Sequence, residues 1–284
     1  MTSTNKPIHH PLDDLLRTDR IPHIWCPGCG IGTAFASCLT AMKASGIDLK
    51  KTVMVSGIGC TARGAGYVML DSYHATHGRA IPFATGLKLA NPELNVVVFS
   101  GDGDLFAIGG NHFIHGARRN VDITVVCVNN LNYGMTGGQV AATTPLNSKT
   151  TTTPAGNPDG PFNLPLMAYA SGATYVSRWT ILHTRDMTES IKDALLNRGF
   201  AFVEVLSPCP VNFGRRNKEN ALDSLKLYQE KTIIKNDAHP TELDIDFDRG
   251  VILGKFVDIE RPTCIDRYDS TCRPPELFNE EKVA

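Results

Sequence analysis

Residues 95–104, which read NVVVFSGDGD, contain the clearest indication of the fold. The run from Val96 to Phe99 is short and continuously apolar, which is typical of a strand covered on both faces of a sheet. Asp102 follows between two glycines, at the point where this strand ends. An acidic side chain there would repel a phosphate group unless a metal ion lay between the two. The stretch therefore predicts a buried strand that ends at a metal-assisted anion site.

Four more segments have the character of this strand, and helical segments separate them. The additional predicted strands span residues 52–56, 122–128, 174–178 and 200–206. Residues 32–46 place apolar side chains at helical spacing and stop at Gly46, and residues 184–199 offer Thr184 as an N-cap. Strands that alternate with helices indicate an α/β fold, with a mostly parallel sheet and helices on both faces.

The composition limits the class of protein. The chain has 284 residues, of which 42% are hydrophobic, so it can bury a substantial core. Lys plus Arg (28) nearly balances Asp plus Glu (29), so net charge favours neither nucleic acid nor an anionic membrane as a partner. The sequence contains no recognisable signal peptide and no apolar run of about 18 residues. We therefore expect a cytoplasmic protein without a membrane span.

Unusual motifs follow four of the five predicted strands. GIGCT follows the first, GDGD the second, NNLNYGMTGGQ the third and SPCP the fifth. Ligands of open α/β sheets bind outside the carboxyl ends of the strands. The four motifs therefore converge on one edge of the sheet, where we expect the functional site.

Oxygen ligands at this edge predict a magnesium site. Asp102 and Asn130 offer side-chain oxygens at strand ends, and the backbone carbonyl of Asn132 could supply a third. Mg²⁺ takes few ligands from protein and completes its shell with water and substrate phosphate. Gly101 and Gly103 allow the backbone to approach a ligand closely. A magnesium-bound diphosphate fits this arrangement.

The eight cysteines divide into candidate ligands and others. In a reducing compartment, short cysteine motifs indicate metal ligands or redox groups rather than disulfides. WCPGCG places Cys26 and Cys29 at a spacing that suits zinc or an iron–sulfur cluster, and Cys60 and Cys209 lie at the ligand edge. Spacing alone does not decide between the two metals. Two cysteines are interpreted as core residues and two are left unassigned: Cys38 and Cys127, then Cys264 and Cys272.

GDG, followed by 25 residues and then NN, resembles the thiamine diphosphate signature of the transketolase and pyruvate-decarboxylase superfamily. The resemblance implies that Asp102 and the second asparagine, Asn130, bind the Mg²⁺ that holds the cofactor's diphosphate. It also implies a set of residues that line the thiamine diphosphate: Gly103, Asp104, Gly134 and Met135.

The combination of WCPGCG, GIGCT, GDGD, NNLNYGMTGGQ and SPCP is similar to the beta subunits of 2-oxoacid:ferredoxin oxidoreductases. The likeness covers residues 10–215, and the lead-in PLDDLLRTDRIPHIWCPGCG looks most like the 2-oxoglutarate branch. The fold implied is the diphosphate-binding type of thiamine diphosphate domain. One 4Fe-4S cluster is implied on four ligands: Cys26, Cys29, Cys60 and Cys209.

The same resemblance implies further contacts with the thiamine. His77 would act near the reactive carbon as the catalytic residue, and Arg79 would orient its loop or an anion. Four consecutive residues would touch the cofactor: Ile58, Gly59, Cys60 and Thr61. We therefore expect the chain to have two parts. Residues 1–215 would bind thiamine diphosphate and the cluster, and residues 216–284 would form an appended C-terminal region that contacts a partner.

The implied reaction is the oxidative decarboxylation of a 2-oxoacid. Coenzyme A takes the acyl group, CO₂ leaves, and electrons pass through the cluster to ferredoxin; reductive carboxylation, a form of carbon fixation, is the reverse. The pyrimidine-binding domain of thiamine enzymes has no room in this chain, so an alpha subunit is expected, in a dimer of αβ pairs. Pyruvate or a branched-chain 2-oxoacid remains an alternative substrate. So do a non-redox thiamine lyase subunit with zinc at the cysteines and a non-catalytic binding module.

Overall fold

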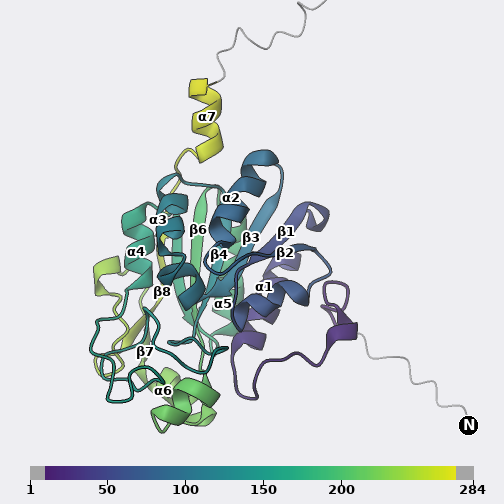
Figure 1. The fold of residues 1–284 in the computed structure, drawn as a ribbon. Helices are drawn as coiled ribbons and strands as arrows, with labels where there is room; N and C mark the ends of the chain where they lie inside the picture. The colour runs from purple at the N-terminus through teal and green to yellow at the C-terminus, as the bar shows by residue number, and fades with distance from the viewer. Residues whose placement is uncertain (1–9, 273–284) are drawn as a thin grey trace, which may run out of the picture.

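Eight strands form one sheet in the computed structural model, which describes residues 10–272 (Figure 1). The strand order is β2-β1-β3-β4-β6-β5-β8-β7. Each neighbouring pair is parallel except β5 and β8, which are antiparallel. The predicted mostly parallel α/β fold is confirmed. The strands are β1 (Thr52–Ser56), β2 (Asp71–His74), β3 (Asn95–Gly101), β4 (Ile123–Asn129), β5 (Tyr175–Thr180), β6 (Phe200–Leu206), β7 (Thr232–Ile234) and β8 (Val251–Asp258).

Helices cover both faces of the sheet and form two hydrophobic cores with it. In β3, Val97 and Phe99 belong to the core that includes α1 and α5, whereas Val96 and Val98 belong to the core that includes α2, α3 and α4. This alternation explains why β3 is apolar without interruption. The helices are α1 (Ile31–Ser45), α2 (Ala80–Ala90), α3 (Gly110–Arg118), α4 (Leu164–Ser171), α5 (Thr184–Leu196), α6 (Ala221–Lys231) and α7 (Cys264–Cys272).

The helix ends follow the sequence signals in one case and depart from them in another. α1 ends as predicted, with Gly46 in the left-handed region at φ 74°. The predicted N-cap of α5 is wrong, because Thr184 is its first helical residue and His183 occupies the cap without a side-chain cap bond. The His183 ring instead contacts the hydroxyl of Thr180 at 2.9 Å, which closes the turn between β5 and α5.

The C-terminal region continues the same sheet. β8 pairs with β5, and β7 pairs with β8, so residues 232–258 extend the sheet beyond β5. α6 precedes them with a capping box, in which Asn220 and Asp223 bond to each other's backbone. α7 stands away from the sheet at the top of Figure 1. Residues 273–284 lie outside the described part of the chain.

The topology places the functional loops together. From β1 the chain passes to β2 on one side and then to β3 on the other, so the direction of the sheet reverses beside β1. A crevice at the carboxyl ends of strands at such a reversal is the usual ligand site of an α/β sheet. Cys38 in α1 and Cys127 in β4 are fully buried, which confirms that both are core residues.

Among residues 10–272, no helix is both long and apolar enough to cross a membrane.

Candidate cofactor and thiol site

A pocket at the carboxyl ends of β1, β3 and β4 collects the residues predicted to bind the cofactor and its metal. The loop after each strand contributes to its wall, and His77 contributes from the segment between β2 and α2. Gly101, which was expected to let the backbone approach a ligand, lines it as well, whereas sequence reasoning missed Tyr133 and Thr136. The predicted residues that line it are Ile58, Gly59, Cys60, Thr61, His77, Asp102, Gly103, Asp104, Asn130, Asn132, Gly134 and Met135.

Three oxygen atoms from the loops after β3 and β4 converge in this pocket. The Asn130 side-chain oxygen faces Asp102 Oδ1 at 3.3 Å and the Asn132 carbonyl oxygen at 2.7 Å, and all three are acceptors. Reversing the Asn130 amide would turn both contacts into hydrogen bonds, whereas a divalent cation would bind the three oxygens as they stand. The donor set therefore fits a hard cation such as Mg²⁺.

Asp102 is a buried carboxylate that no salt bridge neutralises within the described residues. Its exposure is 2%, and burial raises the pKa of its carboxyl to about 6. The Thr143 hydroxyl donates to Oδ2, which leaves Oδ1 on the side of Asn130. A buried charge without a basic partner is costly unless a cation compensates it. Thr143 carries no motif, so sequence reasoning did not find it.

Leu131 gives the loop after β4 its shape. It lies between Asn130 and Asn132 and adopts a left-handed φ of 63°, which costs a non-glycine residue roughly 1–2 kcal/mol. The Thr144 hydroxyl stabilises this conformation by donating to the Leu131 carbonyl at 2.7 Å. Strain of this kind persists where surrounding bonds enforce it, often at functional sites. Here it directs an asparagine side chain and a backbone carbonyl toward one point.

A buried ionic network supports the start of this loop through hydrogen bonds. Arg178 Nε donates to Glu204 Oε2 at 2.6 Å, and both side chains are 0% exposed. Glu204 Oε1 accepts from the Asn129 amide at 2.8 Å, and Asn129 Oδ1 accepts from the Leu131 backbone at 3.1 Å. Arg178 also donates to the Leu243 carbonyl at 2.8 Å. The network therefore connects β5, β6 and the C-terminal region to the base of the asparagine loop.

Asp104 holds His77 in place. Asp104 Oδ1 contacts His77 Nδ1 at 2.5 Å and accepts from the backbone N–H groups of Ile58 and Gly78 at 3.0 and 2.7 Å. Its Oδ2 accepts from the Ser100 hydroxyl at 2.8 Å. The carboxylate predicted to line the cofactor is thus fully engaged within the protein, and its main effect is to orient the His77 ring.

Gly103 and Gly134 lie at two places where other groups of the pocket wall come close to the backbone. A Cβ atom on Gly103 would clash with the Tyr133 ring, which contacts the His77 ring edge-on at 6.1 Å. A Cβ on Gly134 would lie 3.5 Å from the Cys209 sulfur and 3.6 Å from the Cys60 sulfur. Gly134 therefore lies between the two thiols and the cofactor pocket.

The four candidate thiols come from three segments that meet beside the pocket. Cys60 lines the pocket itself, and the Cys209 thiol contacts Asn132 Oδ1 at 3.8 Å. Burial raises the pKa of Cys29 and of Cys60 to about 11 each, and the neighbouring Cys209 and Cys26 thiols add to the shift. Such thiols stay protonated at neutral pH until a metal binds and displaces the protons. The structure brings the four predicted ligands together, with Cys26 exposed at the outer side.

Local packing fixes the turn that carries Cys26 and Cys29. The Cys29 N–H donates to the Cys26 carbonyl at 3.0 Å, and Gly28 between them has a φ of 78° that favours glycine. Trp25, which is 7% exposed, donates from its indole nitrogen to the Cys60 carbonyl at 2.7 Å. This bond joins the first cysteine segment directly to the loop after β1.

Comparisons with known proteins agree with this geometry. Residues 51–205 match the family described as thiamine pyrophosphate enzyme, C-terminal TPP binding domain. A 2-oxoglutarate synthase subunit KorB from Methanothermobacter marburgensis is 49% identical over 91% of this chain and 90% of its own length. The chain belongs to the 2-oxoglutarate branch of the 2-oxoacid:ferredoxin oxidoreductase beta subunits. The KorB subunit of Archaeoglobus fulgidus is 53% identical over 70% of this chain and 74% of its own.

A solved structure extends the similarity of this beta subunit to the whole fold. It is a 2-oxoglutarate:ferredoxin oxidoreductase from Magnetococcus marinus, with 2-oxoglutarate, coenzyme A and succinyl-CoA bound. The match has a TM-score of 0.82 at 32% identity and covers 99% of this chain and 96% of that chain. The family, fold and enzyme class predicted from the motifs are therefore confirmed.

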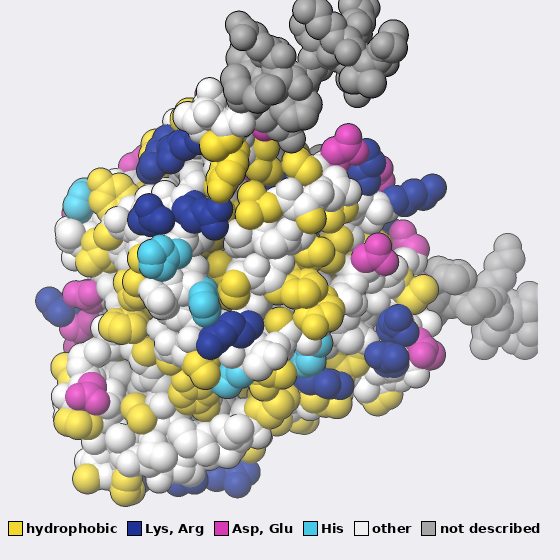
Figure 2. All heavy atoms as spheres, turned by 45° about the horizontal axis from the view of Figure 1, so that its top comes forward, with side chains coloured by type: hydrophobic (Ala, Val, Ile, Leu, Met, Phe, Trp, Pro, Cys, Tyr) yellow, Lys and Arg dark blue, Asp and Glu magenta, His cyan; other side chains and the backbone are white. Residues whose placement is uncertain are grey.

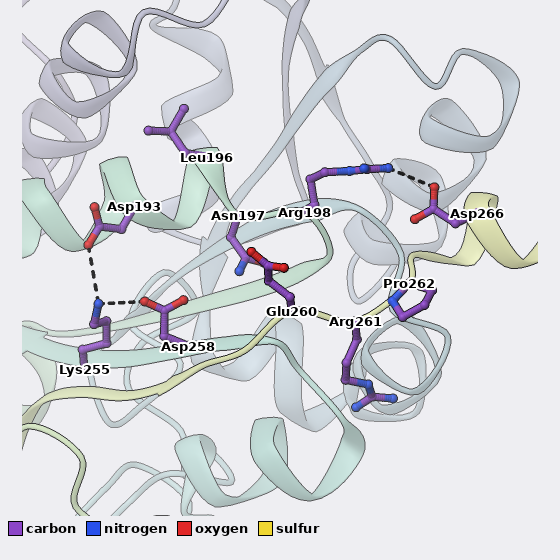
Figure 3. A pocket seen from close by; sticks show the side chains of 10 residues that line it. All are labelled: Asp193, Leu196, Asn197, Arg198, Lys255, Asp258, Glu260, Arg261, Pro262 and Asp266. Carbon is purple, nitrogen blue, oxygen red and sulfur yellow. Dashed lines mark hydrogen bonds and ion pairs between the residues drawn. The ribbon is translucent and has the colours of Figure 1, made fainter.

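A larger cavity of the beta subunit, about 960 Å³, lies away from all of these residues. It is formed by the end of α5, by β8 and by the segment that leads to α7 (Figure 3). Most of its charges pair with one another: Lys255 contacts Asp193 and Asp258, and Arg198 contacts Asp266. Side chains that already form ion pairs with one another attract a charged ligand only weakly. The size of this cavity alone therefore does not make it the functional site.

Proposed function

We propose that this beta subunit carries the thiamine diphosphate, the Mg²⁺ and the 4Fe-4S cluster of a 2-oxoglutarate:ferredoxin oxidoreductase. In the proposed reaction, 2-oxoglutarate and coenzyme A yield succinyl-CoA, CO₂, one proton and two electrons, and two ferredoxins accept one electron each. Reductive carboxylation would be the reverse. The observation that carries the proposal is the position of Cys60, which belongs both to the pocket of the cofactor motifs and to the group of thiols.

Asp102, Asn130 and Asn132 would hold the magnesium. With the Asn130 amide oxygen turned toward the other two oxygens, the three would face one cation, and Mg²⁺ would complete its shell with water and with the diphosphate of the cofactor. When bound, thiamine diphosphate would supply the carbon nucleophile and the electron sink for decarboxylation, and the cluster would supply one-electron transfer. The absence of a side chain at Gly103 leaves room for the Tyr133 ring in the wall of the pocket.

His77 would hold or move a proton at the reactive centre. Asp104 engages Nδ1, so the neutral ring places its proton on Nδ1 and leaves Nε2 as the acceptor on the other side. The His77 side chain is 35% exposed, which leaves it accessible from the pocket. His77 is therefore proposed as the catalytic residue and Asp104 as the residue that positions it.

The Asp104→Asn variant tests that assignment. The amide oxygen of the new side chain could still accept from the Ile58 and Gly78 N–H groups, and the Ser100 hydroxyl could turn to accept from its nitrogen, so the fold should survive. The loss of charge beside His77 should lower kcat about 10-fold, as removal of such orienting partners usually does, with little change in the KM for 2-oxoglutarate. Steady-state kinetics would measure the two constants. The exposed Asp186→Asn on α5 is the matched control, and equal kcat values for the two variants would contradict the role.

The position of the cysteines beside the cofactor pocket favours a cluster over a zinc ion. Cys60 lines the pocket, and Gly134 lies close to both the Cys60 and the Cys209 sulfur. A 4Fe-4S cluster at this position would accept the electrons released on decarboxylation, whereas a zinc ion has no redox chemistry. The alternative of a non-redox lyase subunit with zinc has less support.

Spectroscopy of the anaerobically purified protein tests the metal. We expect broad absorbance near 400 nm that bleaches with dithionite and an electron paramagnetic resonance signal in the reduced state. A colourless protein that contains stoichiometric zinc would refute the redox function. Initial rates with 2-oxoglutarate, pyruvate and branched-chain 2-oxoacids, with ferredoxin as acceptor, would then test the substrate, and a preference for pyruvate would overturn our choice.

An alpha subunit is proposed to complete the site. Ile58 and Met135 line the cofactor pocket, yet they are 40% and 44% exposed, and Ile108, directly after the turn at residues 103–107, is 51% exposed. Figure 2 shows hydrophobic side chains spread over one face of the molecule, with the acidic side chains of that face toward its edges. Apolar side chains exposed around a cofactor site are typical of a surface that a second subunit covers.

Dependence on the partner gives a further prediction. The isolated chain, with its cluster intact, should not turn over 2-oxoglutarate, because the alpha subunit would supply the contacts to the pyrimidine of the cofactor. Adding the alpha subunit should restore turnover, and ferredoxin reduction would be followed by absorbance. Turnover by the isolated chain at the rate of the complex would remove the need for an alpha subunit.

A further inference from the structure

A second pocket beside the cofactor site is lined by basic side chains. It has a volume of about 270 Å³, and its wall includes Arg17, Arg20, Arg63, Ser72 and His74. No aspartate or glutamate of the described residues lines it. We call it the arginine pocket. Arg17 and Arg20 belong to the lead-in PLDDLLRTDRIPHIWCPGCG, whereas Arg63 lies outside the family motifs. The cofactor pocket shares no lining residue with the arginine pocket.

Backbone carbonyls hold two of the three guanidinium groups in position. Arg17 Nε donates to the Val68 carbonyl at 3.3 Å, and Arg20 Nη1 donates to the Gly66 carbonyl at 3.0 Å. Arginine has five N–H donors, so each group keeps further donors for a ligand. The Arg63 side chain makes no hydrogen bond within the described residues, and none of the three arginines forms a salt bridge there.

The edge strand β2 keeps acidic charge out of this pocket. Side chains alternate along a strand, so Ser72 and His74 share one face and line the pocket. Tyr73 lies on the opposite face and stacks on Phe83 at 3.8 Å, and Asp71 shares that face. Burial lowers the pKa of His74, and the charge of Arg63 lowers it further. The wall of the pocket therefore carries three positively charged side chains and no carboxylate among the described residues.

The larger cavity of Figure 3 differs from the arginine pocket in how its charges are paired. There, Arg198 and Lys255 are paired with aspartates of the same cavity wall. Three arginines gathered around a cavity repel one another unless an anion neutralises them. The guanidinium group also matches phosphate oxygens with paired hydrogen bonds. The chemistry that fits the arginine pocket is accordingly a phosphate-bearing ligand.

One short turn links the arginine pocket to the cofactor pocket. The 3₁₀ turn Thr61–Gly66 begins at Thr61, which lines the cofactor pocket, and includes Arg63, which lines the arginine pocket. The Ser56 hydroxyl joins the two sides, since it donates to the Ala62 carbonyl at 2.7 Å and contacts His74 Nδ1 at 3.2 Å. A ligand whose phosphates bind in the arginine pocket could therefore extend along this turn to the cofactor pocket.

We propose that the arginine pocket binds the phosphate groups of coenzyme A, the long thiol substrate that carries a 3′-phosphate and a diphosphate. The proposal rests on the proposed function and adds a binding subsite on this chain. A five-carbon dicarboxylate held at the reactive centre would not need a second pocket that shares no residue with the first. The thiol end of coenzyme A would reach the cofactor pocket along the Thr61–Gly66 turn.

Calorimetric titration of the assembled αβ complex tests this subsite without requiring turnover. Arg63→Gln should weaken coenzyme A binding about 10-fold, the usual effect of losing one charge-assisted hydrogen bond, and Arg20→Gln should act in the same direction. The apparent KM for coenzyme A should rise in parallel, while the KM for 2-oxoglutarate stays that of the wild type. Arg185→Gln, at an exposed position on α5, is the matched control and should bind coenzyme A normally.

Two ligand analogues distinguish the source of the phosphate. Dephospho-coenzyme A and inorganic diphosphate should both bind more weakly than coenzyme A, and the Arg63→Gln variant should lose less affinity for them. Equal binding of inorganic diphosphate and coenzyme A would overturn the proposal in favour of a general anion site. Unchanged coenzyme A affinity in both variants, or loss of the alpha subunit on gel filtration, would also overturn it. Absence of 2-oxoglutarate turnover in a complex that still binds coenzyme A at this pocket would instead refute the proposed function.

Discussion

Asp102→Asn is expected to abolish activity and cofactor binding while the protein without cofactor becomes more stable. Asp102 supplies the charged member of the three converging oxygens, so its neutral replacement should weaken the magnesium-bound diphosphate by about 1000-fold, which corresponds to about 4 kcal/mol. Burial raises the pKa of this carboxyl to about 6, so the ionised form is a cost to the folded protein at neutral pH. An asparagine removes that cost and retains the shape.

Opposite signs for binding and stability make this variant informative. Calorimetry with thiamine diphosphate and Mg²⁺ would measure the affinity, and thermal unfolding without either would measure the stability. The exposed Asp159→Asn is the control and should change neither. If Asp102→Asn lowered the unfolding temperature of the cofactor-free protein, the carboxylate would be a structural group rather than a site held ready for a cation.

Glu204→Gln is expected to lower the free energy of unfolding by about 3–5 kcal/mol. The change leaves Arg178 charged, 0% exposed and without its partner, and its Nη2 already lacks a hydrogen bond. A glutamine can still accept from Asn129, so the effect would report the unpaired charge more than the asparagine loop. Urea unfolding followed by circular dichroism would measure it.

A double variant separates charge from packing in this network. Arg178→Met combined with Glu204→Gln removes the buried charge, so it should recover most of the lost stability even though the Leu243 carbonyl loses a donor. An exposed pair on α5, Lys192 and Glu189, gives the control, because Glu189→Gln should cost under about 0.5 kcal/mol. A double variant as unstable as the single one would assign the loss to packing.

The sequence predicts the fold, and it predicts that the site residues lie together, because both depend on local patterns. A continuous apolar run, such as residues 95–101, predicts a buried strand from neighbouring residues alone. The glycine at position 46 predicts the end of a helix in the same way. The rule that ligands bind at the carboxyl ends of parallel strands then brings the four motifs together. Each candidate cofactor residue lines the pocket for this reason.

Tertiary partners account for what the sequence does not predict. Thr143 contacts Asp102, and Glu204 contacts Asn129 from 75 residues away. Neither Thr143 nor Glu204 belongs to a motif. Asp104 belongs to a cofactor motif. Its Oδ1 nevertheless accepts hydrogen bonds from backbone N–H groups of two other segments and contacts a histidine, so it is engaged within the protein. β8 pairs antiparallel with β5, although many residues separate the two strands in the chain. The periodicity of hydrophobic residues alone does not reveal such a pairing.

The indole bond from Trp25 to the Cys60 carbonyl has a practical consequence. Trp25 and Trp179 are the two tryptophans of the 284-residue chain, so a Trp179→Phe protein would have a single emitter seated between the cysteine turn and the loop of Cys60. Its intrinsic fluorescence would be sensitive to any change in the polarity or position of that loop. Assembly, loading and damage could then be followed in real time, in dilute solution and without an attached dye.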